Sequence, residues 1–444
     1  MSMLYNGVSG LNASSAGLQI VSQNVANAKV AGYSRQTVIL QTNDGALNGV
    51  KITKIERIVD GFLNDDIWRT KSDLSYYESY QDYLGYLEEV LGTDSLNLND
   101  AVAKLNSAFN AALSSPESPA YRQQVISSAS AMVQNLQQLN GALTGQVEKL
   151  GFELTALAGN TNTVLADIAE LNEKIAKATA LGHDTSVLMD NREQAIIELS
   201  GYIQVDVTNQ ADGSVHITTL NGSPLIMAGK AATLSVAGTD VTLKFNNQTF
   251  SIPTGVGGSL GGLLKVNAEV LEPSRLELST LVSGIADAVN TSLSEGFDLN
   301  GNAGAPLFVY NAADPLGSIA VNTALTVDQL AFRGRVPDGF GGWLPAGGKG
   351  DNSNLINIID SMKGVAGGYD TLIGKLAIQS KQVQSSIKTS VVLHDKAIAA
   401  RASVSGVNLD EEAANLTYYR QLYEANAKVI STADQMFMTL MAMF

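Results

Sequence analysis

Residues 409–444 read LDEEAANLTYYRQLYEANAKVISTADQMFMTLMAMF and carry a strong seven-residue repeat. Large apolar side chains recur in it every seven residues, at Leu409, Leu416, Tyr423, Ile430, Phe437 and Phe444. The companion positions three residues later are Glu412, Tyr419, Asn426, Ala433 and Leu440. This is the spacing of a coiled-coil seam. The pattern therefore predicts a long helix with an apolar stripe along one side.

The N-terminal segment carries the same repeat. Its apolar positions are Leu4, Leu11, Leu18 and Val25, and its companion positions are Gly7, Ser14, Val21 and Ala28. The helix is predicted to end near Ala28, where Gly32 permits a turn and Thr37-Val38-Ile39-Leu40 begins a strand. Each repeat alone also fits a core helix of an ordinary globular domain. Two matching seams at opposite chain ends predict that the terminal helices pack together.

Proline and glycine divide the rest of the chain. Only 9 of the 444 residues are proline, none of them before Pro116 or after Pro345. Because proline interrupts helices, its absence permits long helices at both ends. Hairpin signals at Asp212-Gly213 and Asn246-Asn247 interrupt alternating apolar runs, which predicts antiparallel strands. The expected fold is α+β and mainly α, a long helical bundle or coiled coil from both chain ends with an inserted antiparallel β-domain.

Three parts are expected from these patterns. Residues 1–60 with 400–444 would form terminal coiled-coil segments for assembly. Residues 61–203 with 263–297 and 351–399 would form a helical bundle, and residues 204–262 with 298–350 a β-rich outer domain. Within the bundle, a long helix from Pro119 is expected to break at Gly159-Asn160 and to continue as a second, antiparallel helix.

Composition excludes several classes of partner. The net charge is −15, whereas nucleic acids and anionic membranes require a basic surface. No apolar run is long enough to span a bilayer, so no membrane insertion is expected. The first residues lack the basic and apolar regions of a Sec-type signal peptide. The chain has no cysteine, which excludes disulfides and a cysteine nucleophile.

The sequence contains one formal match to a catalytic motif. Gly257-Gly258-Ser259-Leu260-Gly261 fits the G-x-S-x-G pattern of serine hydrolases. Only His394 follows it, in a helical pattern, and such matches arise easily in a glycine-rich stretch. The other histidines, His183 and His216, have no metal-type spacing. We therefore expect no enzyme activity, no catalytic residue, no cofactor and no metal site.

Both chain ends resemble those of bacterial flagellar axial proteins, the family of rod, hook and hook-associated subunits. The N-terminal run LNASSAGLQIVSQNVANAKVAGYSR, from Leu11 to Arg35, resembles the opening motif, including Asn24, Asn27, Gly32 and Tyr33. The run from Ser405 to Met441 resembles the closing motif. LMDNREQAIIELS (188–200) and GFDLNGNAGAPLF (296–308) are similar to segments of the hook-associated members that form the hook–filament junction. The chain looks shorter than many members.

The resemblance implies a structural subunit that self-assembles at the distal end of the hook and joins hook to filament. It implies type III export and a location outside the cell after a cytoplasmic stage. The expected partners are other copies, neighbouring axial proteins (the hook protein and the second junction protein) and a cytoplasmic export chaperone. We expect the terminal segments to be poorly ordered in the free chain and to fold on assembly.

The resemblance and the seams together assign residues to these roles. The expected assembly interface comprises Leu4, Leu11, Leu18, Val25, Leu409, Leu416, Tyr423, Ile430 and Phe437. Candidates for binding the chaperone are Tyr418, Tyr419, Tyr423 and Phe437. The alternatives are a hook or rod subunit, a secreted hydrolase using Ser259, and an adhesin displayed by the β-domain at residues 205–255.

Overall fold

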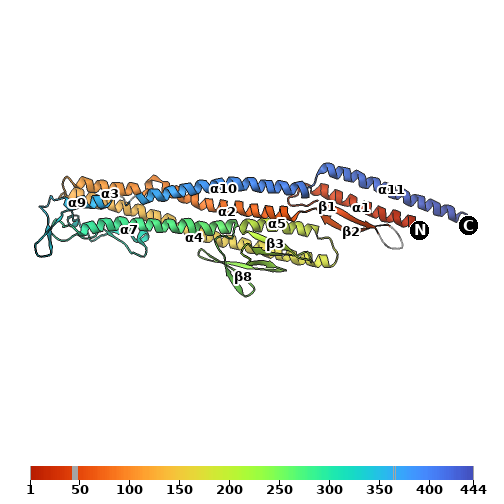
Figure 1. Ribbon diagram of the computed structural model, residues 1–444, viewed down its shortest axis with the longest axis horizontal. Helices are drawn as coiled ribbons and strands as arrows, with labels where there is room; N and C mark the ends of the chain where they lie inside the picture. Colours follow the sequence, from red (N-terminus) through yellow and green to blue (C-terminus); the bar gives the residue numbers. More distant parts are fainter. Residues whose placement is uncertain (1, 43–48, 364, 366, 444) are drawn as a thin grey trace.

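A computed structural model describes residues 2–42, 49–363, 365 and 367–443. Phe444, the last position of the C-terminal repeat, lies outside the described residues. The described part is an elongated rod in which both termini lie at one end (Figure 1). None of its helices is long and apolar enough to cross a membrane.

Helices make up most of the described chain, which confirms the predicted α+β, mainly α class. The helices are α1 (Ser2–Asn27), α2 (Gly61–Gly92), α3 (Leu98–Ala112), α4 (Pro119–Ala180), α5 (Ser186–Tyr202), α6 (Gly258–Val266), α7 (Glu272–Ser294), α8 (Pro315–Ser318), α9 (Ser353–Ser361), α10 (Gly367–Ser405) and α11 (Leu409–Met441). A π-helical turn, Asn267–Leu271, lies between α6 and α7.

The strands form small antiparallel sheets among the described residues. They are β1 (Gln36–Thr42), β2 (Val50–Arg57), β3 (Val205–Asn209), β4 (Val215–Thr219), β5 (Pro224–Met227), β6 (Lys230–Ala231), β7 (Thr233–Ala237), β8 (Asp240–Phe245), β9 (Gln248–Ser251), β10 (Phe308–Val309), β11 (Ala320–Val321), β12 (Arg335–Pro337) and β13 (Trp343–Pro345). The predicted hairpins are confirmed, since β3 pairs with β4 and β8 with β9.

The body of the rod is a bundle of α2, α3, α4 and α10 that α6, α7 and α9 extend. Its core is apolar, and Leu87 of α2, Leu105 and Phe109 of α3, and Leu150 of α4 are fully buried. Several helices begin with a side-chain cap, such as Asp60 accepting from the Phe62 N–H at 2.9 Å. Burial of this apolar surface supplies the main free energy of folding for the body.

Helix α4 is continuous over 62 residues, so the predicted break at Gly159-Asn160 is wrong. A glycine in a helix costs about 1 kcal/mol relative to alanine and removes no backbone hydrogen bond. Burial of the neighbouring Ala158 and Thr161 outweighs this cost. The sheets β3–β6 and β7–β9 pack on the outer side of α4 (Figure 1).

Residues 204–262 and 298–350, expected in one β-rich domain, lie at two separate places along the rod. The first segment forms the sheets beside α4, while β10–β13 lie at the end opposite the termini (Figure 1). Asn290 of α7 holds this far end by accepting from the N–H groups of Leu307 and Phe308 at 2.9 and 3.0 Å.

Helix α10 packs along α2, and polar contacts join the two helices at several points. The Gln81 amide donates to Ser380 at 3.0 Å, and Thr70 Oγ1 lies 3.1 Å from His394 Nδ1. Burial lowers the pKa of His394 below its ordinary 6.5, and the positive charge of Lys71 lowers it further. The neutral imidazole is therefore the form that this interface stabilises.

This shift predicts how stability depends on pH. Below about pH 6.5 the unfolded chain takes up a proton at His394 that the folded chain resists, so the free energy of unfolding falls as the pH drops. His394→Gln should flatten this decline between pH 7.5 and 5.0 in urea titrations, whereas His183→Gln, at an exposed position, should leave it unchanged. Equal slopes for wild type and His394→Gln would contradict the assignment.

Candidate functional site

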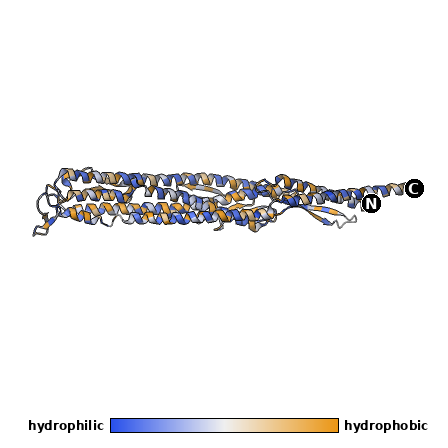
Figure 2. Ribbon diagram, turned by 90° about the horizontal axis from the view of Figure 1, so that it is seen from above, coloured by the Kyte–Doolittle hydropathy of each residue, from blue (hydrophilic) through white to orange (hydrophobic). Residues whose placement is uncertain are grey.

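The terminal unit consists of α1, α11 and the β1–β2 hairpin, and its two helices lie side by side (Figures 1 and 2). The chain ends therefore pack together, as the matching repeats predict. Small residues allow the helices to approach closely. A Cβ atom added at Gly7 would lie 2.7 Å from Ile430 Cγ1, and Gly10 and Gly17 similarly face Asn426 and Tyr419. A larger side chain at these glycines would require the facing side chains of α11 to move or the two helices to separate.

The seam within the chain uses the companion positions and not the leucine repeat. Gly7, Ser14 and Val21 are buried, as are Asn24 and Glu412. The expectation that the large apolar residues line this seam is wrong for most of them. Leucine side chains in the seam would hold α1 and α11 farther apart than glycines do. The shorter separation across the glycines brings more atoms of the two helices into van der Waals contact.

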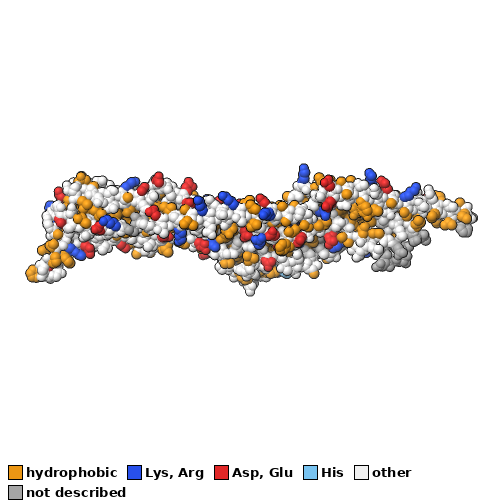
Figure 3. Space-filling model, turned by 45° about the horizontal axis from the view of Figure 1, so that its top comes forward, with side chains coloured by type: hydrophobic (Ala, Val, Ile, Leu, Met, Phe, Trp, Pro, Cys, Tyr) orange, Lys and Arg blue, Asp and Glu red, His pale blue; other side chains and the backbone are white. Residues whose placement is uncertain are grey.

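Most of the large apolar positions instead face solvent. Leu416 is 47% exposed and Phe437 62% exposed. Leu11, Leu18 and Ile430 are only half-buried, and Ile430 lies against Gly7 in the seam. We call eight of these positions the outer stripe. Its exposed residues are Leu4, Val25, Leu409, Leu416, Tyr423 and Phe437, and its half-buried residues are Leu11 and Leu18. Orange apolar side chains gather on this terminal end in Figure 3.

Asn24 ties the three parts of the terminal unit together. Its amide nitrogen donates to the Gln36 carbonyl at 3.0 Å and to Glu412 Oε2 at 3.2 Å. Its amide oxygen accepts from the Gln36 N–H at 3.0 Å and from the Tyr33 hydroxyl at 2.8 Å. The buried side chain thus uses both donors and both acceptor sites, linking α1, β1 and α11.

The other motif residues shape the exit from α1. Asn27 donates to the Gln23 carbonyl at 3.0 Å in the last turn, which ends at Asn27 as predicted. Gly32 has φ +81°, a conformation that favours glycine. Burial raises the pKa of Tyr33 to about 12, and the charges of Asp190 and Glu412 add to the effect. Tyr33 therefore stays protonated and able to donate to Asn24.

Buried charges join the terminal unit to the body. We call this cluster the joint; it comprises Ser34, Arg57, Asp190, Glu193 and Arg401. Arg57 Nη2 lies 2.7 Å from both Asp190 Oδ1 and Glu193 Oε1, and Arg401 Nη2 lies 3.3 Å from Glu193 Oε2. Both arginines also donate to Ser34 Oγ at 3.2 Å. Two positive and two negative charges meet, so the cluster is neutral.

The joint connects segments that are far apart in sequence. Arg57 ends β2, Asp190 and Glu193 lie on α5, and Arg401 lies near the end of α10. Burial raises the pKa of Asp190, and the charge of Arg57 opposes the shift. Beside the joint, the Arg35 N–H donates to the Ser405 carbonyl at 2.8 Å, and the Arg35 side chain pairs with Glu411. The terminal unit is thus fixed to the body by charge and hydrogen bonding.

The segment 188–200 contacts both the joint and the sheet beside α4. While Asp190 and Glu193 face the joint, Arg192 donates to Asn172 Oδ1 at 3.1 Å and to the Gly213 carbonyl at 2.7 Å. Asn172 in turn donates to the Val215 carbonyl at 2.8 Å. Burial lowers the pKa of Arg192 to about 10, which still leaves it charged at neutral pH. Helix α5 thereby links the joint to the sheet beside α4.

Three of the four aromatic residues expected to bind a chaperone are open to solvent. Tyr418, Tyr423 and Phe437 are exposed. Tyr419 differs, because it lies against Gly17 in the seam and its ring meets that of Tyr418 edge-on at 5.4 Å. In the folded terminal unit, Tyr419 therefore packs within the chain.

The G-x-S-x-G match lies at the start of α6. Gly257 and Gly258 have positive φ values, and the Gly258 N–H donates to Ser72 Oγ at 2.9 Å. In the described chain, no hydrogen bond joins Ser259 to His394, which contacts Thr70 instead. No cluster of metal-binding side chains occurs in the same part of the chain. The glycines thus form part of the connection between β9 and α6.

Known protein families match both the ends and the body of the chain. Residues 84–308, just over half of the chain, match the family described as flagellar hook-associated protein FlgK helical domain. The chain belongs to this FlgK family. Its ends match two broader families, flagella basal body rod protein at residues 4–33 and flagellar basal body rod FlgEFG protein C-terminal at residues 400–443.

Curated relatives of this FlgK-family chain match along nearly its whole length. Flagellar hook-associated protein 1 of Salmonella typhimurium is 26% identical and aligns over 99% of both chains. The Bacillus subtilis protein of that name is 23% identical over 96% of this chain and 95% of its own. The Salmonella alignment spans 548 positions, whereas this chain has 444 residues, so the relative carries segments without a counterpart here.

A solved structure shows the same fold. The flagellar hook junction protein FlgK from Burkholderia pseudomallei superposes with a TM-score of 0.68 at 15% identity. The match covers 78% of this chain and all of that chain.

The joint generates a prediction about stability. Arg57→Ala would leave the Asp190 and Glu193 carboxylates buried without their main partner, and we expect the free energy of unfolding to fall by ~3–5 kcal/mol. Lys54→Ala, on the same strand, breaks an exposed ion pair with Glu56 and should cost less than ~1 kcal/mol. Urea unfolding of both variants measures the difference. Equal losses would show that the joint does not stabilise the protein.

Proposed function

We propose that this chain is a structural subunit of the bacterial flagellum that assembles at the distal end of the hook and joins hook to filament. Membership of the FlgK family supports this role. The observation that carries it is the terminal unit, in which small and polar residues fill the seam and the outer stripe faces solvent. A folded surface of this kind gains free energy when a neighbouring subunit covers it.

The outer stripe supplies the driving force for assembly in this proposal. Complete burial of a large apolar side chain is worth ~2 kcal/mol, so even partial burial of the eight positions of the outer stripe adds several kcal/mol per subunit. The stripe runs on both α1 and α11, which allows one subunit to contact neighbours on two sides. We propose the same stripes as the contact with the hook protein and the second junction protein.

Export and chaperone binding belong to the same proposal. The chain would leave the cell unfolded through the flagellar export channel, and the terminal segments would gain their final order on assembly. Before export, a cytoplasmic chaperone would cover Tyr418, Tyr423 and Phe437, whose side chains are exposed on α11. An amphipathic helix laid in an apolar groove is a common recognition mode.

A hook or rod subunit is the alternative within the same structural class. The terminal matches at residues 4–33 and 400–443 are to rod-type families and do not distinguish these roles. The match of residues 84–308 to the hook-associated family favours the junction.

Removal of the protein from a motile cell tests the proposed role. We expect completed hooks without filaments, together with flagellin released into the medium, and both defects should be reversed by the wild-type chain. Electron microscopy of isolated hooks and analysis of the medium measure the two outcomes. Normal filaments on the deletion strain would refute the junction role, and the absence of hooks would indicate a rod or hook subunit.

The outer stripe can be tested with a single charge. Leu416→Asp places a carboxylate where a neighbour would bury it, at a cost of several kcal/mol, so the variant should be exported but should not join hooks. Gln421→Asp adds the same charge at another exposed position of α11 and should be incorporated normally. Quantitation of each variant on hooks and in the medium gives the result. Normal incorporation of Leu416→Asp would remove the stripe from the interface.

A further inference from the structure

The second half of α10 places its apolar residues on the outside. Ser390, His394, Ala397 and Arg401 face α2, whereas larger apolar side chains face solvent. We call the solvent-facing set the α10 outer face; it comprises Val391, Val392, Leu393, Ile398 and Val404, with Val392 52% exposed. An ordinary surface helix has the opposite arrangement.

This face continues the outer stripe beyond the terminal unit. Helix α10 ends at Ser405 and α11 begins at Leu409, the first exposed leucine of the C-terminal repeat. Exposed apolar side chains therefore lie on both helices, with Val404 near the end of α10 and Leu409 at the start of α11. Clustered exposed apolar side chains mark interaction sites in soluble proteins. Two exposed lysines flank it, Lys388 and Lys396, and they outnumber the one exposed carboxylate within its span, Asp395.

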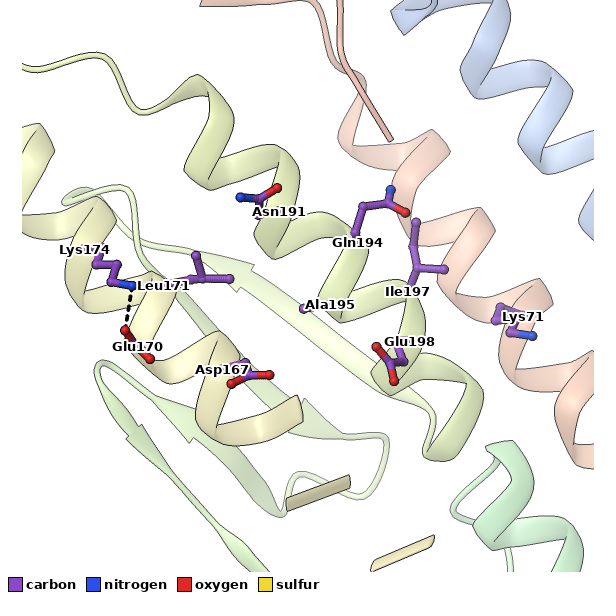
Figure 4. A pocket seen from close by; sticks show the side chains of 10 residues that line it. All are labelled: Lys71, Asp167, Glu170, Leu171, Lys174, Asn191, Gln194, Ala195, Ile197 and Glu198. Atoms are coloured by element: carbon purple, nitrogen blue, oxygen red, sulfur yellow. Dashed lines mark ion pairs between the residues drawn. The ribbon is translucent and has the colours of Figure 1, made fainter. Parts of the chain in front are cut away.

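A groove with apolar residues and an excess of carboxylates in its lining lies on other helices of the body (Figure 4). It has a volume of about 650 Å³ and lies among α2, α4 and α5. Leu171, Ala195 and Ile197 supply its apolar lining. Carboxylates predominate at its rim, where Asp167, Glu170 and Glu198 outnumber Lys71 and Lys174, and Lys174 is already paired with Glu170 at 2.6 Å.

The groove and the α10 outer face lie at the same level of the rod. Lys71 lines the groove, and its sequence neighbour Thr70 contacts His394, which lies between Val392 and Ile398 on α10. Helix α2 separates the two surfaces, so one does not cover the other. Two copies placed side by side without a shift along the rod would therefore bring one surface opposite the other.

We propose that the α10 outer face of one copy docks into the groove between α4 and α5 of a second copy. This inference rests on the proposed function and extends the assembly interface from the terminal unit to the body. Charge complementarity and continuity with the outer stripe favour a second copy over an unrelated protein. Because the two surfaces differ, the contact is heterologous, and its repetition closes a ring around an axis or continues as a helix.

Cross-linking tests the contact directly, because the chain has no cysteine of its own. We expect Val392→Cys combined with Ala195→Cys to give a ladder of linked subunits when hooks carrying the variant are treated with a short bis-maleimide. Each single variant should give no ladder. Val392→Cys with Leu276→Cys is the matched control, because Leu276 is 70% exposed on α7 outside the groove. No ladder from the first pair on hooks that carry filaments would overturn the inference.

A second variant separates this inference from the proposed function. Val392→Asp should lower incorporation at the junction at least tenfold, whereas Leu276→Asp should be incorporated normally. If the deletion strain lacks filaments but Val392→Asp assembles like wild type, the junction role stands and the docking is refuted. If Val392→Asp fails to assemble and the cysteine pair gives no ladder, another partner covers the face and the docking is again refuted.

Discussion

The close approach of α1 to α11 is the contact on which the rest of the structure depends. Gly7, Gly10 and Gly17 remove the side chains that would separate the helices, and Asn24 joins them to β1. Because the small residues fill the inside, the leucines of both repeats are left on the outside. In this fold the terminal unit keeps exposed apolar surface on both of its helices.

The joint fixes the orientation of the terminal unit relative to the body. Paired charges hold the terminal unit in a defined position on the body, and such pairs require specific geometry where apolar contacts do not. Helix α10 repeats the same principle, with polar residues inside and valines and isoleucine outside. A single pattern thus runs from Ser390 to Met441, in which internal contacts use mainly small and polar groups and most large apolar groups face solvent.

Much of the fold follows from local sequence. The proline-free ends predict the long helices, the turn signals predict the hairpins, and Gly32 marks the exit from α1. The seam orientation does not follow, because a seven-residue repeat shows two faces and does not say which one meets the partner helix within the chain. Gly7 and Gly17 are the sequence features that indicate which face of α1 meets α11. The joint could not be predicted, since Arg57, Asp190 and Arg401 are more than a hundred residues apart in sequence. Gly159 shows that one weak helix former does not end a well-packed helix.

We propose that the outer stripe is open in the free subunit and buried in the assembled junction. Maleimide labelling of the single cysteine in Leu416→Cys tests this, with its rate compared between the free chain and isolated hooks that carry the variant. Gln421→Cys is the control for general access. We expect rapid labelling of both variants in the free chain and strong protection of Leu416→Cys alone on hooks. Equal labelling of Leu416→Cys in both states would contradict it.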